Sequence, residues 1–577
     1  MPSEQPLFAS NRRESSSHSE ERAAAEDTAL LGGQRKDEPV AHNRTRFWRE
    51  LGLFTWAVVA TAAVIVLAVV ITQHGGSHKD GKNTKPTGKR NLIFMVSDGM
   101  GPASLSMTRS FRQFEGGLPH ADVLVLDQHF IGSSRTRSSN SLITDSAAGA
   151  TAFSCGMKSY NGAISILPDH TPCGTVLEAA KKAGYTTGLV VTTSITDATP
   201  ACFASHANVR SEEDLIAEQE VGEHPLGRVV DLVLGGGRCH FLPNTTSGSC
   251  RGDDKDLTKL AQEKHGWNYI DNRKDFDGLK LGSAVKLPLL GLFAGYNIPY
   301  ELDRRNMNDV YPSLDEMATT ALKALEAATQ DSDKGFFLMI EGSRIDHAGH
   351  GNDPAAQVRE VLAYDKAFAS VLDFLENSST EGVLVATSDH ETGGLAVARQ
   401  LHITYPHYVW YPEILSNASS SAEHLSRNLR SYMSGEGDSL KDFISEELVK
   451  KGLGIMDAKD SEIQLIVDDP ERSSYYFTDM VSRRARIGWS THGHSAVDVN
   501  IYGSAGSEAL RGNHENVEVG QFLRDYLDVD VQAITVELAE KGKSFTISGA
   551  DWTGKIPTED LLQSVATEAE TAYGIAP

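Results

Sequence analysis

Residues 91–98, Asn91-Leu-Ile-Phe-Met-Val-Ser-Asp98, form an apolar run that ends in a carboxylate. Four more apolar runs follow, at Gly188–Thr193, Asp231–Leu234, Phe336–Glu341 and Val383–Asp389, and the last two also end in a carboxylate. Continuous β-branched and aromatic runs of this length are typical of strands buried on both faces of a parallel sheet. Helical stretches such as 175–183 and 354–375 separate the runs. The sequence therefore predicts an α/β fold with a central, mostly parallel sheet flanked by helices.

Three of the predicted strands end in acids, and histidines follow them closely. Burying three anions at one sheet edge costs several kcal/mol each unless cations compensate. A single aspartate at a strand end is more often a helix cap, and a single histidine more often surface or core. The combination instead predicts a multinuclear metal site, with mixed Asp/His ligands for zinc and oxygen ligands for magnesium. The candidates are Asp98, Glu341, Asp346, His350, Asp389, His390, His492 and His494, with a further apolar strand at Val497–Tyr502.

A small-residue helix is predicted to begin within Thr144-Asp145-Ser146-Ala-Ala-Gly-Ala-Thr-Ala152. Read locally, Ser146 is best explained as the N-cap of that helix. The alternative is a nucleophile, whose alkoxide the helix dipole and a neighbouring metal would both favour.

A membrane anchor is predicted near the N-terminus. From Leu51 to Thr72 the chain has 22 residues without a charge, enough for a helix of about 33 Å. Residues 1–50 are predicted to be a disordered cytosolic tail and residues 73–88 a flexible stalk. Glu26-Asp-Thr-Ala-Leu30-Leu31 resembles an acidic dileucine signal for cytosolic sorting adaptors. Sequons after the span, at Asn244, Asn377 and Asn417, favour a single-pass type II protein with a lumenal catalytic part.

Six segments resemble those of the alkaline phosphatases, in the same order. They are SDGMG, TDSAAGATA, DATPA followed by Arg210, EGSRIDHAGH, TSDHETGG and HGHSAVDV, between residues 97 and 499. The resemblance covers roughly residues 88–530, and the anchor and dileucine make fungal vacuolar members the best match. It implies metal-dependent hydrolysis of phosphate monoesters of broad specificity through a phosphoserine. It also implies a homodimer, with two Zn²⁺ and one Mg²⁺ per subunit, on the vacuole membrane.

The resemblance also implies a role for each matched residue. Ser146 would be the nucleophile, and Arg210 would grip two phosphate oxygens with its planar fork. Asp346, His350 and His494 would hold the first zinc, and Asp98, Asp389 and His390 the second. Asp98 would also meet a magnesium completed by Thr199 and Glu341, with Asp197 close by. His347 and His492 would not be ligands.

The sequence also predicts an inserted region, a C-terminal extension and a disulfide. Residues 395–488 are predicted to form an inserted cap, with helices at 422–433 and 439–451, within a lumenal domain spanning 89–577. Residues after about 530 match the family poorly and are expected to form a removable extension. Cys239 and Cys250 are predicted to pair, whereas the pairing of Cys155, Cys173 and Cys202 stays open with at least one free thiol.

Other functions fit the sequence less well. The net charge of −24 argues against a nucleic-acid binder. A sulfatase would need a C/S-x-P-x-R context, which the sequence after Ser146 lacks. A phosphodiesterase or another relative on the same fold remains the enzymatic alternative. A membrane-tethered metal-binding protein without turnover is the non-enzymatic one.

Overall fold

The computed structural model describes residues 54–56, 61, 88–433, 439–547 and 549–558. The predicted tail, almost all of the predicted membrane segment and all of the stalk except Gly88 therefore lie outside the described residues. Within the described ranges, no helix combines the length and the apolar character needed to cross a membrane. The described residues from 88 onward belong to one compact unit.

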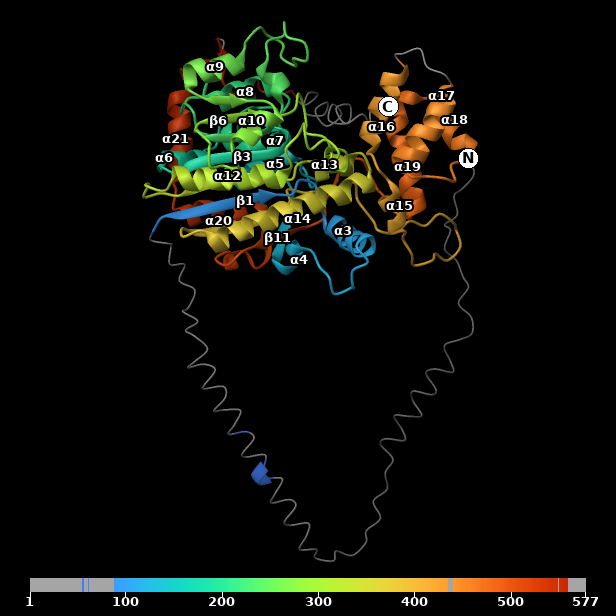
Figure 1. Ribbon diagram of the computed structural model, residues 1–577. Coiled ribbons are helices and arrows are strands. Elements are labelled where there is room, and N and C mark those ends of the chain that lie inside the picture. Colours follow the sequence, from blue (N-terminus) through green and yellow to red (C-terminus); the bar gives the residue numbers. More distant parts are fainter. Residues whose placement is uncertain (1–53, 57–60, 62–87, 434–438, 548, 559–577) are drawn as a thin grey trace, which may run out of the picture. The chain divides into compact units, whose positions relative to one another are not determined.

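A sheet of ten strands forms the centre of this unit (Figure 1). Seven neighbouring strands run parallel, which confirms the predicted parallel core. β11 pairs antiparallel with both neighbours, β8 and β2, so the predicted strand near 497–502 has the opposite direction to the core. In spatial order the strands are β12 (Gly512–Glu515), β2 (Phe130–Arg135), β11 (Val499–Gly503), β8 (Glu381–Thr387), β1 (Arg90–Val96), β7 (Phe336–Glu341), β3 (Thr186–Ser194), β4 (Leu232–Gly236), β6 (Leu289–Leu292) and β5 (Asn268–Ile270).

Helices cover both faces of the sheet, because strand β1 and its neighbours are apolar on both sides. Leu92, Phe94 and Val96 pack into the core that α6 (Val176–Lys182) and α20 (Asn516–Leu527) complete. Ile93 and Met95 point to the opposite face, as the two-residue period of a strand requires. There α12 (Leu314–Ala328) and α14 (Pro354–Asn377) close the second core.

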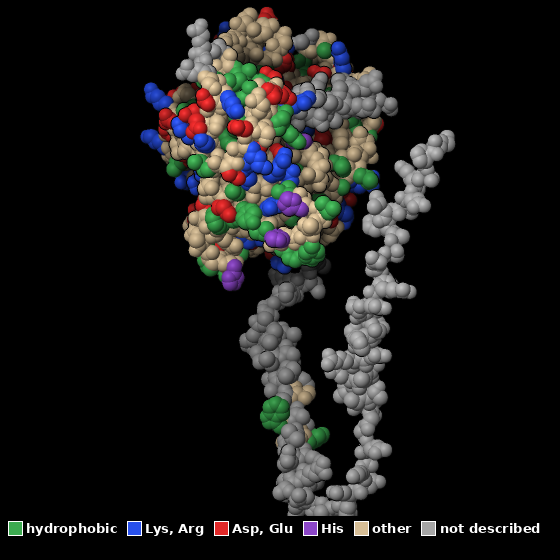
Figure 2. All heavy atoms as spheres, turned by 90° about the vertical axis from the view of Figure 1, so that its right-hand side faces the viewer, with side chains coloured by type: hydrophobic (Ala, Val, Ile, Leu, Met, Phe, Trp, Pro, Cys, Tyr) green, Lys and Arg blue, Asp and Glu red, His purple; other side chains and the backbone are tan. Residues whose placement is uncertain are grey.

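An inserted helical region follows β9 (Glu391–Thr392), and it shares its hydrophobic core with Met107 and Phe111 of α3 (Pro102–Glu115) and Ala355 and Val358 of α14. Figure 2 views the molecule from the side of these helices and shows acidic and basic side chains interspersed there. The exposed apolar side chains of Ile403, Tyr405 and Tyr408 lie in the loop that opens the insert. Its described helices are α15 (Pro412–Asn417), α16 (Ala422–Met433), α17 (Leu440–Phe443), the π-helix η2 (Ile444–Gly452), α18 (Asp460–Asp468), the 3₁₀ helix η3 (Pro470–Arg472) and α19 (Ser473–Ala485).

The residues after 530 form α21 (Val531–Gly542) and a two-stranded hairpin of β13 (Thr546–Ile547) and β14 (Ala550–Asp551). Trp552 follows the hairpin and is buried with α21 against Ala179 of α6. This segment is thus packed onto the catalytic unit as far as it is described.

Candidate active site

The three strand-ending carboxylates meet at one edge of the sheet. Asp98 and Asp389 each lie two residues beyond the ends of β1 and β8, and Glu341 is the last residue of β7. β1 lies between β7 and β8, so the three carboxylates are neighbours. Gly99 has a positive φ of 75°, and a Cβ there would lie 2.5 Å from the Cα of Asp346. Glycine therefore allows the loop after β1 to pass directly over the helix that carries further candidate ligands.

One triad consists of Asp346 and His350, on α13 (Arg344–His350), and His494 from β10 (His494–Ser495). The four-residue spacing on α13 places Asp346 and His350 on one face of the helix. His350 Nε2 lies 3.3 Å from Asp346 Oδ2, and His494 Nε2 lies 3.1 Å from His350 Nε2 and 3.6 Å from Asp346 Oδ1.

A second triad consists of Asp98, Asp389 and His390, all buried. His390 Nε2 lies 3.1 Å from Asp389 Oδ2 and 3.7 Å from Asp98 Oδ1. The rings of His390 and His494 stack with centroids 3.5 Å apart, so the two triads are adjacent.

The tautomers of the three histidines leave their Nε2 lone pairs facing the carboxylates. His494 Nδ1 donates to the carbonyl of Thr144 at 2.8 Å, and His350 Nδ1 donates to the carbonyl of His492. The hydroxyl of Thr392 donates to Asp346, so it accepts from His390 Nδ1. Lone pairs and carboxylates that converge without a proton between them need a cation, and this donor set fits zinc.

The electrostatics of the carboxylates also favour a bound cation. Burial, followed by the charges of Asp389, Asp346 and Glu341, raises the pKa of Asp98 well above its usual value. Burial opposes ionisation of Asp346 too, but His350 and His494 keep its pKa well below the usual value. Asp98 Oδ1 and Asp389 Oδ2 have no hydrogen-bond partner among the described residues. These oxygens are buried and only accept hydrogen bonds when ionised, so a metal ion bound between them would supply compensating positive charge.

An oxygen-rich group adjoins the second triad. The hydroxyl of Thr199, on α7 (Ala198–Ala204), lies 3.4 Å from Asp98 Oδ2 and also bonds to Glu341. Burial and then the charges of Asp197 and Asp389 raise the pKa of Glu341 to about 8, although bonds from Ser343 and Thr199 oppose this shift. Hydroxyl and carboxylate oxygens of this kind suit a hard cation such as magnesium.

Ser146 is the first residue of α5 (Ser146–Cys155) and not its cap, so the local interpretation of Ser146 as a cap is wrong. The cap is Asp145, whose Oδ1 accepts the Ala148 N–H at 3.0 Å. Because Asp145 satisfies that donor, the Ser146 hydroxyl is turned to the second triad, with Oγ 3.1 Å from His390 Nε2. Gly149 permits this approach, since a Cβ there would lie only 2.9 Å from the Cβ of Asp389.

Arg210 lies beside the same helix terminus. Its Nη2 donates to Asp197 Oδ1 at 2.9 Å, and its Nη1 donates to Asp145 Oδ2 at 3.4 Å. Asp197 itself caps α7, the helix that carries Thr199. Two carboxylates, one at each helix N-terminus, thus fix the plane of the guanidinium.

The remaining histidines of the motifs lie around the triads rather than in them. His347 is buried, accepts from Arg344 Nε at 3.2 Å and lies 3.9 Å from Asp197. His492 Nδ1 lies 2.7 Å from the carbonyl oxygen of His350. The sequence pattern assigns no role to Thr392, Ser343 or Asp145, although all three lie inside the matched motifs. Only the fold shows that their side chains orient the candidate ligands and Arg210.

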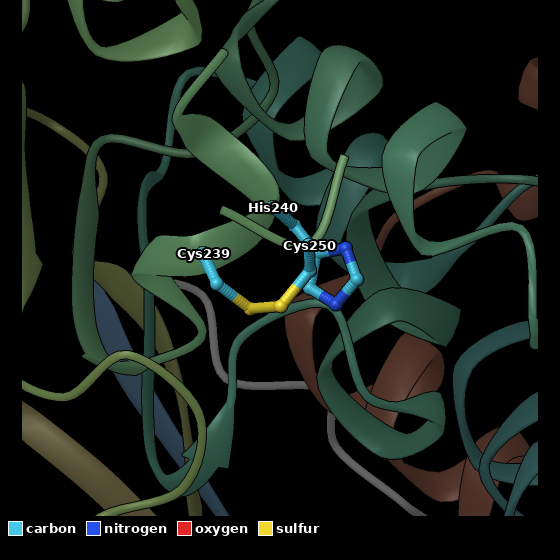
Figure 3. A group of neighbouring side chains, drawn as sticks. All are labelled: Cys239, His240 and Cys250. Carbon is cyan, nitrogen blue, oxygen red and sulfur yellow. A yellow bond between two sulfur atoms is a disulfide. The ribbon is translucent and has the colours of Figure 1, made fainter. Parts of the chain in front are cut away.

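Two other groups of potential ligands do not fit a metal. Cys239 and Cys250 form a disulfide beside His240, so their sulfurs are not free thiolates (Figure 3). Cys155 pairs with Cys173, and Cys202 is a buried free thiol. Glu178, His206 and His224 form a buried cluster, but His224 Nδ1 accepts the Leu226 N–H at 3.1 Å. In neutral His224, Nε2 therefore carries the proton and cannot act as a ligand.

The comparisons with known proteins agree with this geometry. The family model described as alkaline phosphatase matches residues 89–529. The repressible alkaline phosphatase of Saccharomyces cerevisiae is 55% identical over 502 residues, which cover 83% of this chain and 88% of the yeast protein. The crystal structure of Thermus thermophilus alkaline phosphatase is 28% identical, covers 81% of this chain and 99% of its own, and superposes with a TM-score of 0.64. A TAB5 alkaline phosphatase variant with Mg bound in its M3 site is 26% identical and superposes with a TM-score of 0.52. The match covers 77% of this chain and 99% of the TAB5 chain. The chain therefore belongs to the alkaline phosphatase family and is a metal-dependent phosphate monoester hydrolase.

Proposed function

We propose that hydrolysis proceeds through a phosphoserine on Ser146. The observation that carries this proposal is the position of Ser146 Oγ, 3.1 Å from His390 Nε2 at the first turn of α5. The serine oxygen attacks phosphorus, and the alcohol leaves with the serine proton. Water then breaks the Ser146 O–P bond, releasing inorganic phosphate and restoring the hydroxyl. The positive end of the α5 dipole favours the anionic groups that both steps bring to this terminus.

The metals are assigned to three adjoining groups. Asp346, His350 and His494 would hold one zinc, Asp98, Asp389 and His390 a second, and Asp98, Thr199 and Glu341 a magnesium. When bound, zinc ions lower the pKa of an oxygen nucleophile and stabilise charge on the leaving oxygen. Arg210, oriented by Asp145 and Asp197, would bind two phosphate oxygens in a bidentate contact.

Broad specificity follows from these roles, because each assigned residue acts on phosphate or metal and none on the alcohol. The test compares chromogenic phosphate monoester and diester substrates, each with and without a chelator. Chelator-sensitive turnover of the monoester with little turnover of the diester supports the proposal. Preference for the diester would favour the phosphodiesterase alternative, and bound zinc without turnover would favour a metal-binding protein.

The proposed location is the vacuole membrane, with residues 73–577 in the lumen. Asn244, Asn377 and Asn417 are all exposed, as glycosylation requires, and the structure pairs Cys239 with Cys250. Changing Leu30 and Leu31 to Ala should misroute the enzyme without changing its activity in detergent. A glycosidase shift and protease protection in intact organelles would support this topology. Unmodified sequons together with a protease-sensitive catalytic part would refute it.

A homodimer is also proposed. The exposed Ile403, Tyr405 and Tyr408 of the insert offer apolar area suited to such an interface. Sedimentation of the catalytic part as a monomer at micromolar concentration would contradict it.

A further inference from the structure

His240 occupies a fixed position next to a disulfide. It lies on the short 3₁₀ helix η1 (Arg238–Phe241), which follows β4. The residue before it, Cys239, is bonded to Cys250, as Figure 3 shows. The Cys250 N–H also donates to the Cys239 carbonyl at 3.0 Å. The disulfide and this bond together hold the backbone that carries the imidazole.

Both ring nitrogens of His240 face carboxylates. Nε2 lies 3.1 Å from Glu213 Oε2, and Nδ1 lies 3.0 Å from Asp214 Oδ1. Ionised carboxylates only accept hydrogen bonds, so both nitrogens must donate, which makes the ring an imidazolium. The side chain of His240 is 12% exposed, so water screens these two contacts only partly.

Glu213 connects His240 to the proposed phosphate-binding arginine. Glu213 Oε2 also accepts from the Thr196 hydroxyl at 2.6 Å. Thr196 immediately precedes Asp197, which caps α7 and accepts from Arg210 Nη2. Burial would raise the pKa of Glu213, but the bonds from His240 and Thr196 and the charges of His240 and Arg210 lower it. The charge of Glu213 therefore interacts with that of Arg210.

We propose that His240 is a positioning residue for phosphate binding. Its positive charge compensates Glu213 and Asp214, so that Glu213 holds the Thr196–Asp197 turn without competing with substrate for Arg210. This inference rests on the proposed role of Arg210.

The charged groups around His240 set the pH at which its ring loses the positive charge that compensates Glu213 and Asp214. Glu213 and Asp214 face it from α8 (Glu213–Val221), and Arg251 donates to the carbonyls of His240 and Asp214. Burial alone would lower the pKa of His240, but bonds and charge from the two carboxylates raise it to about 9. Affinity for phosphate is therefore expected to fall as the pH rises through about 9. Inorganic phosphate has no pKa of its own between pH 8 and 10, so it is a suitable probe.

The test is competitive inhibition by inorganic phosphate, measured from pH 7 to 10 with the metal-loaded enzyme. His240→Gln should weaken inhibition about three- to tenfold at pH 8, from the loss of one nearby charge. The same substitution should change kcat less than twofold, and it should flatten the decrease of phosphate affinity near pH 9. Adding Glu213→Gln should restore inhibition, because it removes the uncompensated charge. His265→Gln is the matched control, since His265 also pairs with a glutamate, Glu223, at 2.8 Å.

The outcomes separate this inference from the proposed function. The role of His240 alone would be overturned if His240→Gln left both the inhibition by phosphate and its pH profile unchanged while Arg210→Ala weakened that inhibition. Failure of Glu213→Gln to restore inhibition would overturn it too. Unchanged inhibition in Arg210→Ala would instead remove the proposed role of Arg210. If His240→Gln does not fold, the wild-type profile still decides: constant inhibition between pH 8 and 10 would contradict the inference.

Discussion

The carboxylate of Asp145 contacts three groups that meet at the active site. One oxygen caps α5 through Ala148, and the other accepts from the Gly162 N–H at 2.9 Å and from Arg210. Because Asp145 supplies the cap, the neighbouring serine hydroxyl is not needed for one. At the scale of single residues, this division explains how Ser146 can face the second triad.

Single ligands also control the charge balance of the site. Asp389→Ala or His494→Ala should lower the zinc content and the melting temperature together, because bound metal stabilises the folded state and the other carboxylates would lose their cation. Elemental analysis and thermal unfolding check this expectation. His407→Ala, at an exposed position in the insert, is the control and should change neither quantity. Full zinc content in both ligand variants would refute the assigned roles.

At the scale of elements, helix α5 and the loop after β8 must approach each other closely. Gly149 is the contact point, and a Cβ there would meet Asp389 at 2.9 Å. Gly149→Ala should therefore displace either the helix or the ligand, costing about 1–3 kcal/mol of stability. It should also weaken zinc binding, measured by titration with a chelating competitor. Gly278→Ala, on α10 (Arg273–Gly278) with open space around it, should leave zinc binding unchanged. Equal zinc affinity in Gly149→Ala and wild type would contradict this account of the packing.

The longer strands of the parallel core were predictable from sequence, whereas β6, with four buried residues, and the half-exposed or very short strands were not. β1, β3, β4, β7 and β8 were predicted because strands buried on both faces leave continuous apolar runs. β2, which alternates between exposed and buried residues, and β5, with three residues, leave weak patterns. The direction of β11 was also not predicted, because strand direction depends on pairing rather than on composition. In the site, strand-end acids pointed to metals, but the contacts of Asp145 and Thr392 depend on chain segments far apart in sequence.

At the scale of the whole molecule, the acidic site links stability to pH when metals are removed. Burial raises the pKa of Glu341 to about 8 in the folded, metal-free protein, whereas an unfolded glutamate titrates near 4.5. Between these values the folded state binds more protons than the unfolded state, so stability falls as the pH rises. The melting temperature of chelated protein should therefore decrease from about pH 4.5 to 8. Zinc and magnesium should remove most of this decrease. A chelated protein that becomes more stable across the same range would contradict the charge balance described above.

The most direct test of the central claim is phosphate labelling of Ser146. Incubation with radioactive inorganic phosphate at low pH, followed by denaturation, should leave covalent label on the wild-type protein. Ser146→Ala should fold, keep its zinc and magnesium, and carry no label. Label of equal amount in Ser146→Ala would contradict the phosphoserine mechanism.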